Sequence, residues 1–256
     1  MAKNLTVGTE VYIPLPILGL SFDHPSAFYR TKVLELSKKG GQVNVSLPGG
    51  GTKWVSANTV YRTIQFLVIM IGDYKTERSL LRPLANCVTS FLRIMIPGDQ
   101  LIFEAIRTPD ELKYIWEQYA EGTSHFVVIG HGEQDGLLFG EGLKLDAKKL
   151  MEILVPRGEP KIFLSLCCHT GHEKFAKTIS ESKAFQAFIG PSEGLHGCIG
   201  AQFAQTFFSF LFLSKHLAPF AWQTANDSTP IKPIFKYWLR GDETKISQIR
   251  KKIQKS

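Results

Sequence analysis

Apolar and polar positions follow one period near the start of the chain and another through the rest of it. Over the first 62 residues, short runs alternate between apolar and polar side chains, so that Val43, Val45 and Leu47 fall on one face. Period two is typical of a half-buried strand, and the glycine triplet at 49–51 supplies the positive-φ positions that tight hairpins favour. The pattern predicts a small antiparallel β-barrel over residues 1–62.

From residue 63 onward the chain alternates between strand and helix patterns. The segment 64–71, IQFLVIMI, is almost continuously apolar, which is typical of a parallel strand buried on both faces. Further strands are expected at 100–105, 125–129, 161–166 and from residue 187, and helices at 79–95, 108–122, 145–154 and 201–217. Such alternation predicts an α/β fold over residues 63–256, with a mostly parallel sheet flanked by helices.

Two of the expected helices carry further signals. Thr108 suits an N-cap, Pro109 the first helical position, and Glu111 the third position of a capping box. The segment 201–217 is rich in Phe, and its wide apolar face is expected to pack against the sheet. Both helices are therefore predicted to contribute to the core of the α/β part.

Composition narrows the class of protein. With 256 residues, 44% hydrophobic and 21% charged, the chain is typical of a globular protein, which excludes lasting disorder, collagen-like repeats and coiled coils. The four cysteines are too few for a disulfide framework, and residues 1–16 lack the apolar core of a secretory signal, so we expect a cytoplasmic protein with reduced thiols. The longest later apolar stretch, residues 207–213, is far shorter than the roughly 18 residues that span a bilayer, so no membrane segment is expected.

Net charge is concentrated at the C-terminal end. Residues 231–256 hold eight Lys or Arg against two acidic residues and so carry most of the formal net charge of +7. A basic tail can bind nucleic acid or acidic lipid, but the final stretch KISQIRKKIQKS has no aromatic residue that could stack on bases. We therefore interpret it as a solvated amphipathic end-helix, and nucleic-acid binding stays as an alternative.

Residues suited to nucleophilic catalysis follow two of the predicted strands. His131 lies in the sequence GHG after 125–129, and the pair Cys167-Cys168 follows 161–166. The carboxyl ends of parallel strands meet at one edge of a sheet, so we expect His131 and a cysteine to lie side by side. Cysteine protease chemistry needs this arrangement, because an imidazole accepts the proton of the thiol that attacks the carbonyl carbon. Glycines beside both groups leave backbone N–H groups free to stabilise an oxyanion.

These motifs resemble those of the caspase-like (clan CD) cysteine proteases. Metacaspases end the same two strands in a His-Gly pair and in D-C-C-H-S-G, and CHAT-domain proteases show a similar His-Gly pair and L-S-A-C-E-T-G, which LSLCCHTG resembles. The order of a strand ending in Ile-Gly, a loop and a long apolar helix over 187–212 also follows the CHAT pattern. The resemblance covers about residues 64–225 and implies a caspase-like fold, while residues 5–62 resemble the Tudor-like family of small barrels in pattern alone.

The protease resemblance implies roles for individual residues. His131 matches the general base, and the backbone N–H groups of Gly132 and the nucleophile match the oxyanion hole. Counting back from the shared C-H-[S/T]-G selects Cys168 as the nucleophile, whereas counting forward from L-S-x-C would select Cys167. We predict Cys168 as the nucleophile and interpret Cys167 as a buried strand-end residue.

The position two before the predicted nucleophile departs from the metacaspase pattern. Leu166 stands where those proteases have an acidic residue that helps to bind an Arg or Lys side chain of the substrate. We therefore expect an apolar or small residue before the scissile bond. Asp73 and Glu193, in neighbouring loops, are the candidates for an acid that replaces it in the specificity pocket.

The predicted function is a cysteine endopeptidase that cleaves a protein substrate with a Cys168/His131 dyad and needs no metal or organic cofactor. Adjacent cysteines are poorly spaced for zinc, because successive side chains at a strand end point to opposite faces. The resemblance implies an effector that a partner activates in an antiviral defence or cell-death pathway, with a regulatory protein docking on the N-terminal barrel. The alternatives are a catalytically silent caspase-like scaffold and a nucleic-acid adaptor that uses the barrel and the basic tail.

Overall fold

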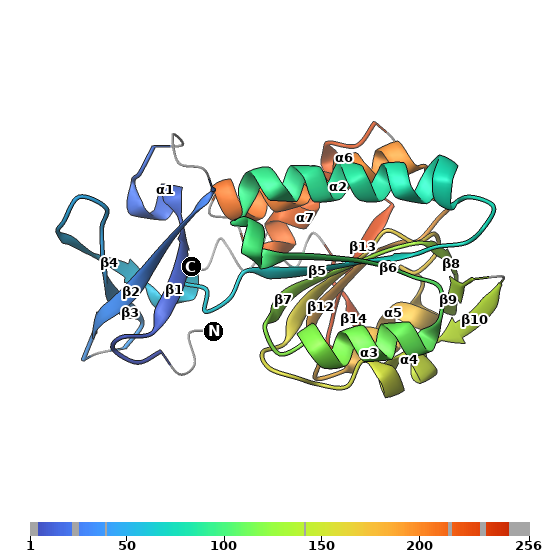
Figure 1. Cartoon of the computed structure of the whole chain (residues 1–256), viewed down its shortest axis with the longest axis horizontal. Coiled ribbons are helices and arrows are strands. Elements are labelled where there is room, and N and C mark those ends of the chain that lie inside the picture. The colour runs from blue at the N-terminus through green and yellow to red at the C-terminus, as the bar shows by residue number, and fades with distance from the viewer. Residues whose placement is uncertain are drawn as a thin grey trace.

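The computed structural model describes residues 5–21, 26–38, 40–140, 142–214, 217–230 and 234–245. Figure 1 shows a small sheet formed by the N-terminal strands, a large sheet with helices on both faces, and a third, three-stranded sheet beyond the large one. The end-helix expected in the basic tail falls largely on residues 246–256, outside the described ranges.

The N-terminal sheet is antiparallel, with its strands in the order β1-β2-β3-β4. These strands are β1 (Glu10–Pro14), β2 (Phe28–Leu36), β3 (Gln42–Ser46) and β4 (Thr52–Ser56), and the short helix α1 (Leu15–Leu18) follows β1. Inward side chains at period two, such as Val43 and Val45, belong to a small apolar cluster within this region. The glycines at 49–51 all have positive φ, as the predicted hairpin requires.

The closed Tudor-like barrel is not confirmed. Beyond β4 and the 3₁₀ turn η1 (Ala57–Thr59), the chain returns to β1 at an isolated antiparallel bridge between Tyr12 and Tyr61. Each of these residues donates its N–H to the carbonyl oxygen of the other, at 2.8 and 2.9 Å. Within the described ranges the sheet is open apart from this bridge.

The N-terminal sheet also packs on the α/β part. The rings of Phe28 and Tyr61 contact the ring of Phe212, with centroids 4.9 and 6.2 Å apart. The backbone N–H of Ala27 donates to the carbonyl oxygen of Met95 at 2.6 Å. The division predicted between residues 62 and 63 therefore separates two sheets whose side chains share one apolar cluster.

The large sheet has the strand order β14-β13-β12-β11-β7-β5-β6. Its strands are β5 (Gln65–Ile71), β6 (Leu101–Ile106), β7 (Thr123–Ile129), β11 (Lys161–Ser165), β12 (Phe185–Pro191), β13 (Phe235–Leu239) and β14 (Asp242–Glu243). The run from β6 to β12 is parallel, and β13 and β14 extend it in antiparallel pairing. The predicted α/β fold with a mostly parallel sheet is confirmed.

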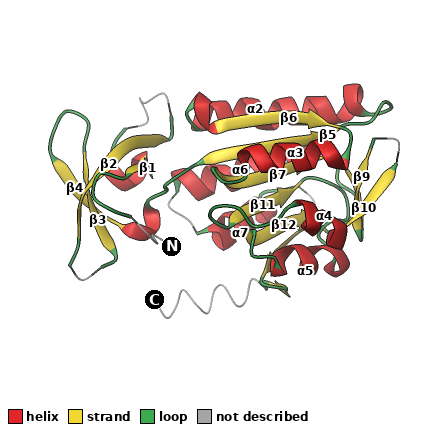
Figure 2. Ribbon diagram, turned by 60° about the horizontal axis from the view of Figure 1, so that its bottom comes forward, coloured by secondary structure: helices red, strands yellow, loops and turns green. Residues whose placement is uncertain are grey.

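Helices cover both faces of this sheet (Figures 1 and 2). One face carries α2 (Arg82–Met95), α6 (Gly197–Leu213) and α7 (Ala218–Asp227), and the other carries α3 (Pro109–Tyr119), α4 (Ala147–Ile153) and α5 (Glu173–Glu181). As expected, the Phe-rich helix α6 packs on the sheet, with Phe208 edge-on to Phe66 of β5 at 4.9 Å. Of the helices described, none is both long and apolar enough to cross a membrane.

Caps explain where several elements begin. The capping box at Thr108 is confirmed, because its Oγ1 accepts the N–H of Glu111 and the Glu111 carboxylate accepts the N–H of Thr108. Helix α6 begins four residues earlier than the pattern predicted, since the ring of His196 caps it by accepting the N–H of Cys198. A π-turn, η2 (Glu77–Leu81), leads into α2, and a 3₁₀ turn, η3 (Gly98–Gln100), leads into β6.

The third sheet was not predicted from the sequence. Its strands are β8 (His131–Glu133), β9 (Gly136–Phe139) and β10 (Leu143–Asp146), in the order β10-β9-β8. Leu145, which the apolar pattern placed in a helix, lies in β10 instead, because Asp146 caps α4 by accepting the N–H of Lys149 at 2.8 Å. The hairpin β8–β9 starts at His131, directly beyond β7, and so extends from the carboxyl edge of the large sheet.

Candidate active site

The His131 and Cys168 motifs follow two neighbouring parallel strands. Val128 of β7 pairs with Ser165 of β11, and His131 and Cys168 each lie three residues beyond that pair. Gly132 approaches the cysteine loop so closely that a Cβ placed on it would lie 2.7 Å from the carbonyl oxygen of Cys168. Both motifs therefore reach the same edge of the sheet, and glycine at position 132 permits that approach.

The two adjacent cysteines have different surroundings. Cys167 is fully buried in the cluster on the α5 face, with its Sγ 3.8 Å from the carbonyl oxygen of Val128. Burial raises the pKa of the Cys167 thiol to about 12. Cys168 is partly exposed, and its Sγ accepts the backbone N–H of Leu195 at 3.1 Å. Since the thiolate is the reactive form, the raised pKa and the burial of Cys167 make it poorly suited to act as a nucleophile near neutral pH.

The imidazole of His131 faces two oxygen atoms from the loop after β5. Its Nε2 lies 2.9 Å from Asp73 Oδ2 and 2.6 Å from Thr76 Oγ1. The Thr76 hydroxyl donates its only proton to Asp73 Oδ2, at 2.6 Å, so its oxygen accepts from the ring. Both contacts require a proton on Nε2. In the neutral ring Nδ1 is then unprotonated and can accept a proton.

The Asp73 carboxylate is held in place by the loop that follows it. Its Oδ1 accepts the backbone N–H groups of Lys75 and Thr76, at 2.6 and 2.5 Å. Burial raises the pKa of the Asp73 carboxyl, but the hydrogen bonds from Thr76 and Lys75 and the neighbouring His131 outweigh it and hold the pKa below its usual range. Asp73, which the sequence suggested for the specificity pocket, thus lies against the predicted base in an ionised state.

The loop that carries Cys168 is tied to the end of β12. The N–H of His169 donates to the carbonyl oxygen of Glu193 at 3.2 Å, and that of Gly171 to Pro191 at 2.7 Å. His169 adopts a left-handed backbone conformation with φ of 62°, which is uncommon for a residue other than glycine. Its Nδ1 is buried without a hydrogen-bond partner among the described residues.

The other two specificity candidates have different surroundings. Leu166 is 3% exposed and packs in the cluster on the α6 face, and Leu195 reaches the same region, since a Cβ on Gly200 would meet side-chain atoms of both. Glu193 is exposed, and its contact with the cysteine loop is through its carbonyl oxygen. The α6 side of Cys168 is therefore apolar.

Two residues at this site were missed by the sequence reasoning. Thr76 follows Asp73 by three positions, and Asp-x-x-Thr after a strand is a recognisable turn signal. Leu195 lies 27 residues beyond Cys168, and no local pattern marks its contact with the sulfur. Within the described ranges, no group of three or more His, Cys, Asp or Glu side chains could hold a metal ion.

Comparison with known proteins finds likeness in structure rather than in sequence. No family model and no curated protein matches the chain. A secreted C11 cysteine protease from Bacteroides thetaiotaomicron, solved with an irreversible peptide inhibitor, superposes with a TM-score of 0.51 and 10% identity, over 70% of this chain and 66% of its own. A further structure of a secreted C11 protease from that organism, called iotapain, gives a TM-score of 0.41 and 12% identity over 61% and 64%.

The first of these likenesses supports a caspase-like fold over 70% of this chain. The chain spans just under two thirds of the length of that protease. This likeness does not test the more specific resemblance to CHAT proteases and metacaspases.

Proposed function

We propose that the protein is a cysteine endopeptidase with Cys168 as nucleophile and His131 as general base. The observation that carries this proposal is the imidazole of His131, oriented by Asp73 and Thr76 at the end of the strand next to the one that leads to a partly exposed Cys168. The fold shared with a C11 cysteine protease supports it.

Each step of the chemistry has a group suited to it. His131 accepts the thiol proton of Cys168 at Nδ1, and the thiolate attacks the peptide carbonyl carbon. The carboxylate of Asp73 stabilises the imidazolium that forms, and the imidazolium then gives its proton to the leaving amine. A water molecule, with His131 again as base, hydrolyses the thioester and restores the thiol.

Backbone N–H groups of Gly132 and Cys168 are suited to stabilise the tetrahedral oxyanion. Glu133 and Gly136 close a two-residue turn, and hydrogen-bonded and non-hydrogen-bonded pairs alternate along antiparallel strands. Gly132, opposite Leu137, is then a non-hydrogen-bonded pair, so its N–H points away from β9. The oxyanion hole therefore combines this N–H with that of Cys168.

The site favours an apolar or small residue before the scissile bond. Leu166 and Leu195 make the α6 side of Cys168 apolar, and Asp73 is engaged by His131. Glu193 is the candidate acid that remains, and it is exposed on the loop after β12. Replacing an acidic anchor by leucine removes the charge that would bind an Arg or Lys side chain.

We further propose that the N-terminal sheet docks a regulatory protein and that the enzyme is a cytoplasmic effector in an antiviral defence or cell-death pathway. The CHAT resemblance of the sequence supports this role. The proposed division into units at 1–62 and 63–256 follows the change from the antiparallel sheet to the α/β sheet.

Thiol labelling tests the proposed activity. A peptide-like electrophile near pH 7, read by mass spectrometry, should label Cys168 in the wild type, and the label should disappear in Cys168→Ala and fall strongly in His131→Ala. Labelling of Cys167 instead would move the nucleophile by one residue. No labelling with or without candidate partners would favour the catalytically silent scaffold.

A further inference from the structure

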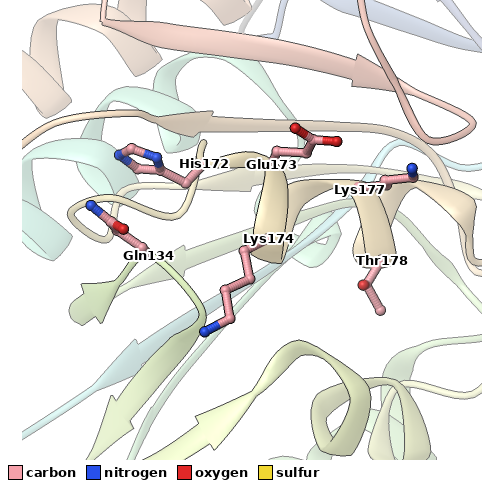
Figure 3. A pocket seen from close by; sticks show the side chains of 6 residues that line it. All are labelled: Gln134, His172, Glu173, Lys174, Lys177 and Thr178. Carbon is pink, nitrogen blue, oxygen red and sulfur yellow. The ribbon is translucent and has the colours of Figure 1, made fainter.

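A polar groove lies next to the cysteine loop, on the α5 face of the sheet. One cavity of about 330 Å³ is lined by Glu133, Gln134, Asp135, His169 and Lys174. A second, of about 410 Å³, continues along α5 and shares Gln134 and Lys174 with the first. Figure 3 shows Gln134 of the hairpin and His172 close together at one end of the second cavity, with Lys174 reaching down beside the hairpin.

The groove starts at the residues that directly follow both catalytic candidates. His169 follows Cys168, and Glu133 to Asp135 follow His131 and Gly132 in the β8–β9 hairpin. Because the leaving amine takes its proton from His131, the substrate beyond the scissile bond passes on the side of this hairpin. The apolar side of Cys168, at Leu166 and Leu195, is then left for the residue before the bond.

His169 is the unusual residue in the groove. A left-handed backbone is strained at a residue that has a Cβ, and such conformations cluster at functional sites. Its buried Nδ1 is also without a hydrogen-bond partner in the part of the chain that the structure describes, and buried polar groups are normally paired. Because Nδ1 is buried, a substrate side chain in the groove would hydrogen-bond this ring at its other nitrogen, Nε2.

The charged side chains that line the first cavity are paired with one another or with Lys144. Asp135 binds Lys144 and Lys174, each at 2.8 Å, and Glu133 binds Lys144 at 3.1 Å. Glu173 and Lys177 are also charged, but they lie further along α5 in the second cavity, and the remaining lining of the first cavity is the amide of Gln134 and the imidazole of His169. This composition favours an uncharged polar partner over an ionised or aliphatic one.

We propose that the groove is the leaving-group subsite of the peptidase, and that it takes a Ser, Thr, Asn or Gln side chain from one of the first residues after the scissile bond, hydrogen-bonded by the His169 imidazole. The inference rests on the proposed function, because it assigns a substrate class to the same site. It concerns the residues after the scissile bond, whereas the sequence led to a prediction only for the residue before it.

The test is digestion of a pool of peptides from a denatured proteome, with both sides of each cut read by mass spectrometry. His169→Gly removes the ring but keeps a residue that adopts positive φ without strain, and His169→Asn keeps a hydrogen-bonding side chain that also tolerates it. Gln134→Ala tests whether the side of the groove formed by the β8–β9 hairpin contributes to the preference. Gln186→Ala, an exposed glutamine near the amino end of β12, is its matched control.

The wild type should enrich uncharged polar residues at one of the first three positions after the cut. His169→Gly should lower that enrichment about fivefold, the size of one neutral hydrogen bond, while the residues before the cut stay as in the wild type. His169→Asn should retain part of it, Gln134→Ala should weaken it, and Gln186→Ala should leave it unchanged.

Two outcomes would overturn the inference alone. One is wild-type cleavage with no preference after the cut, and the other is a preference that survives His169→Gly. A preference for charged or aliphatic residues at these positions would also contradict it. Absence of cleavage together with absence of Cys168 labelling would instead overturn the proposed function, and this inference with it.

Discussion

One histidine lies near the amino end of strand β7 and another follows its carboxyl end, and the two have opposite surroundings. At the amino end, His125 is 2% exposed and stacks on Phe66 with ring centroids 4.6 Å apart. Burial lowers the pKa of His125 to about 3. Just beyond the carboxyl end, the side chain of His131 is 34% exposed and lies 2.9 Å from the carboxylate of Asp73.

Strand β11 repeats the contrast. At its amino end the buried Lys161 donates to the carbonyl oxygens of Arg157 and Glu159, at 2.5 and 2.8 Å, while Cys168 beyond its carboxyl end is partly exposed. Reactive residue types therefore stand at both edges of one sheet. At the amino edge, His125 and Lys161 are buried among aromatic rings and carbonyl groups, which suits a structural role. At the carboxyl edge, His131 and Cys168 are partly exposed to solvent, and His131 contacts a carboxylate and a hydroxyl group.

The largest expected effect separates the two histidines by function. His131→Ala should lower the rate of Cys168 labelling about 10²- to 10⁴-fold, because the general base is lost. His125→Ala should leave the labelling rate of the folded protein near the wild-type value and lower the free energy of unfolding by about 2–4 kcal/mol. Labelling kinetics measure the first effect, and urea unfolding measures the free energy of unfolding. An equal loss of labelling rate in both variants would remove the distinction.

Asp73→Asn should lower the labelling rate about 10- to 10²-fold, since the amide cannot hold the protonated Nε2 of His131 as the carboxylate does. The labelling rate of Thr76→Ser should stay near that of the wild type, while the rate of Thr76→Val should fall as in Asp73→Asn.

The pKa of Asp73 is lowered, so its contribution to the free energy of unfolding is present above the ordinary carboxyl pKa and is lost as pH falls through the lowered value. Urea unfolding below about pH 4 should show that component in the wild type and lack it in Asp73→Asn.

His125 makes the amino edge sensitive to acid. Its pKa of about 3 lies below that of the unfolded chain, so the unfolded state binds more protons between about pH 6.5 and 3, and stability falls on acidification by at most about 1.4 kcal/mol per pH unit. In His125→Phe, the phenyl ring keeps the contacts with Phe208 and Phe212 but cannot titrate. Urea unfolding from pH 7 to 5 should therefore show a shallower slope in this variant. An unchanged slope would assign the acid sensitivity to other groups.

The smallest expected effect belongs to Lys161. Burial lowers the pKa of Lys161 to about 8, so the unfolded state binds more protons between about pH 8 and 10.5 and wild-type stability should rise with pH there. Lys161→Met should remove this rise and cost about 1 kcal/mol at pH 7 through the two carbonyls left without a donor. Cys168 labelling should not change, and a loss of labelling would place Lys161 in the site after all.

The sequence was informative wherever one segment carried its own signal. The capping box at Thr108, the buried run of β5 and the Phe-rich helix α6 each depend on neighbours in the chain, and the structure confirms them. The extent of α6 was misplaced because its cap, His196, is an uncommon capping residue. The β8–β9–β10 sheet was missed because its strands are three or four residues long.

Contacts across the site depend on how distant segments pack, which no local pattern records. The contact between Thr76 and His131 joins residues 55 positions apart. The sequence therefore indicated Asp73 only as a candidate acid for the specificity pocket and did not predict its contact with His131. The strained backbone at His169 is likewise set by bonds from its loop to the end of β12. Those bonds appear only when the strands are placed side by side.

The ring contacts between the N-terminal sheet and α6 have a practical consequence for fragments of this protein. Phe28 and Tyr61 cover the ring of Phe212, and all three lie in or against one apolar cluster. A chain cut at residue 63 would present that phenyl ring and its neighbours to water, and newly exposed apolar surface promotes self-association. Poor solubility of such a fragment would therefore report the loss of a packing partner and would say nothing about a lost regulator.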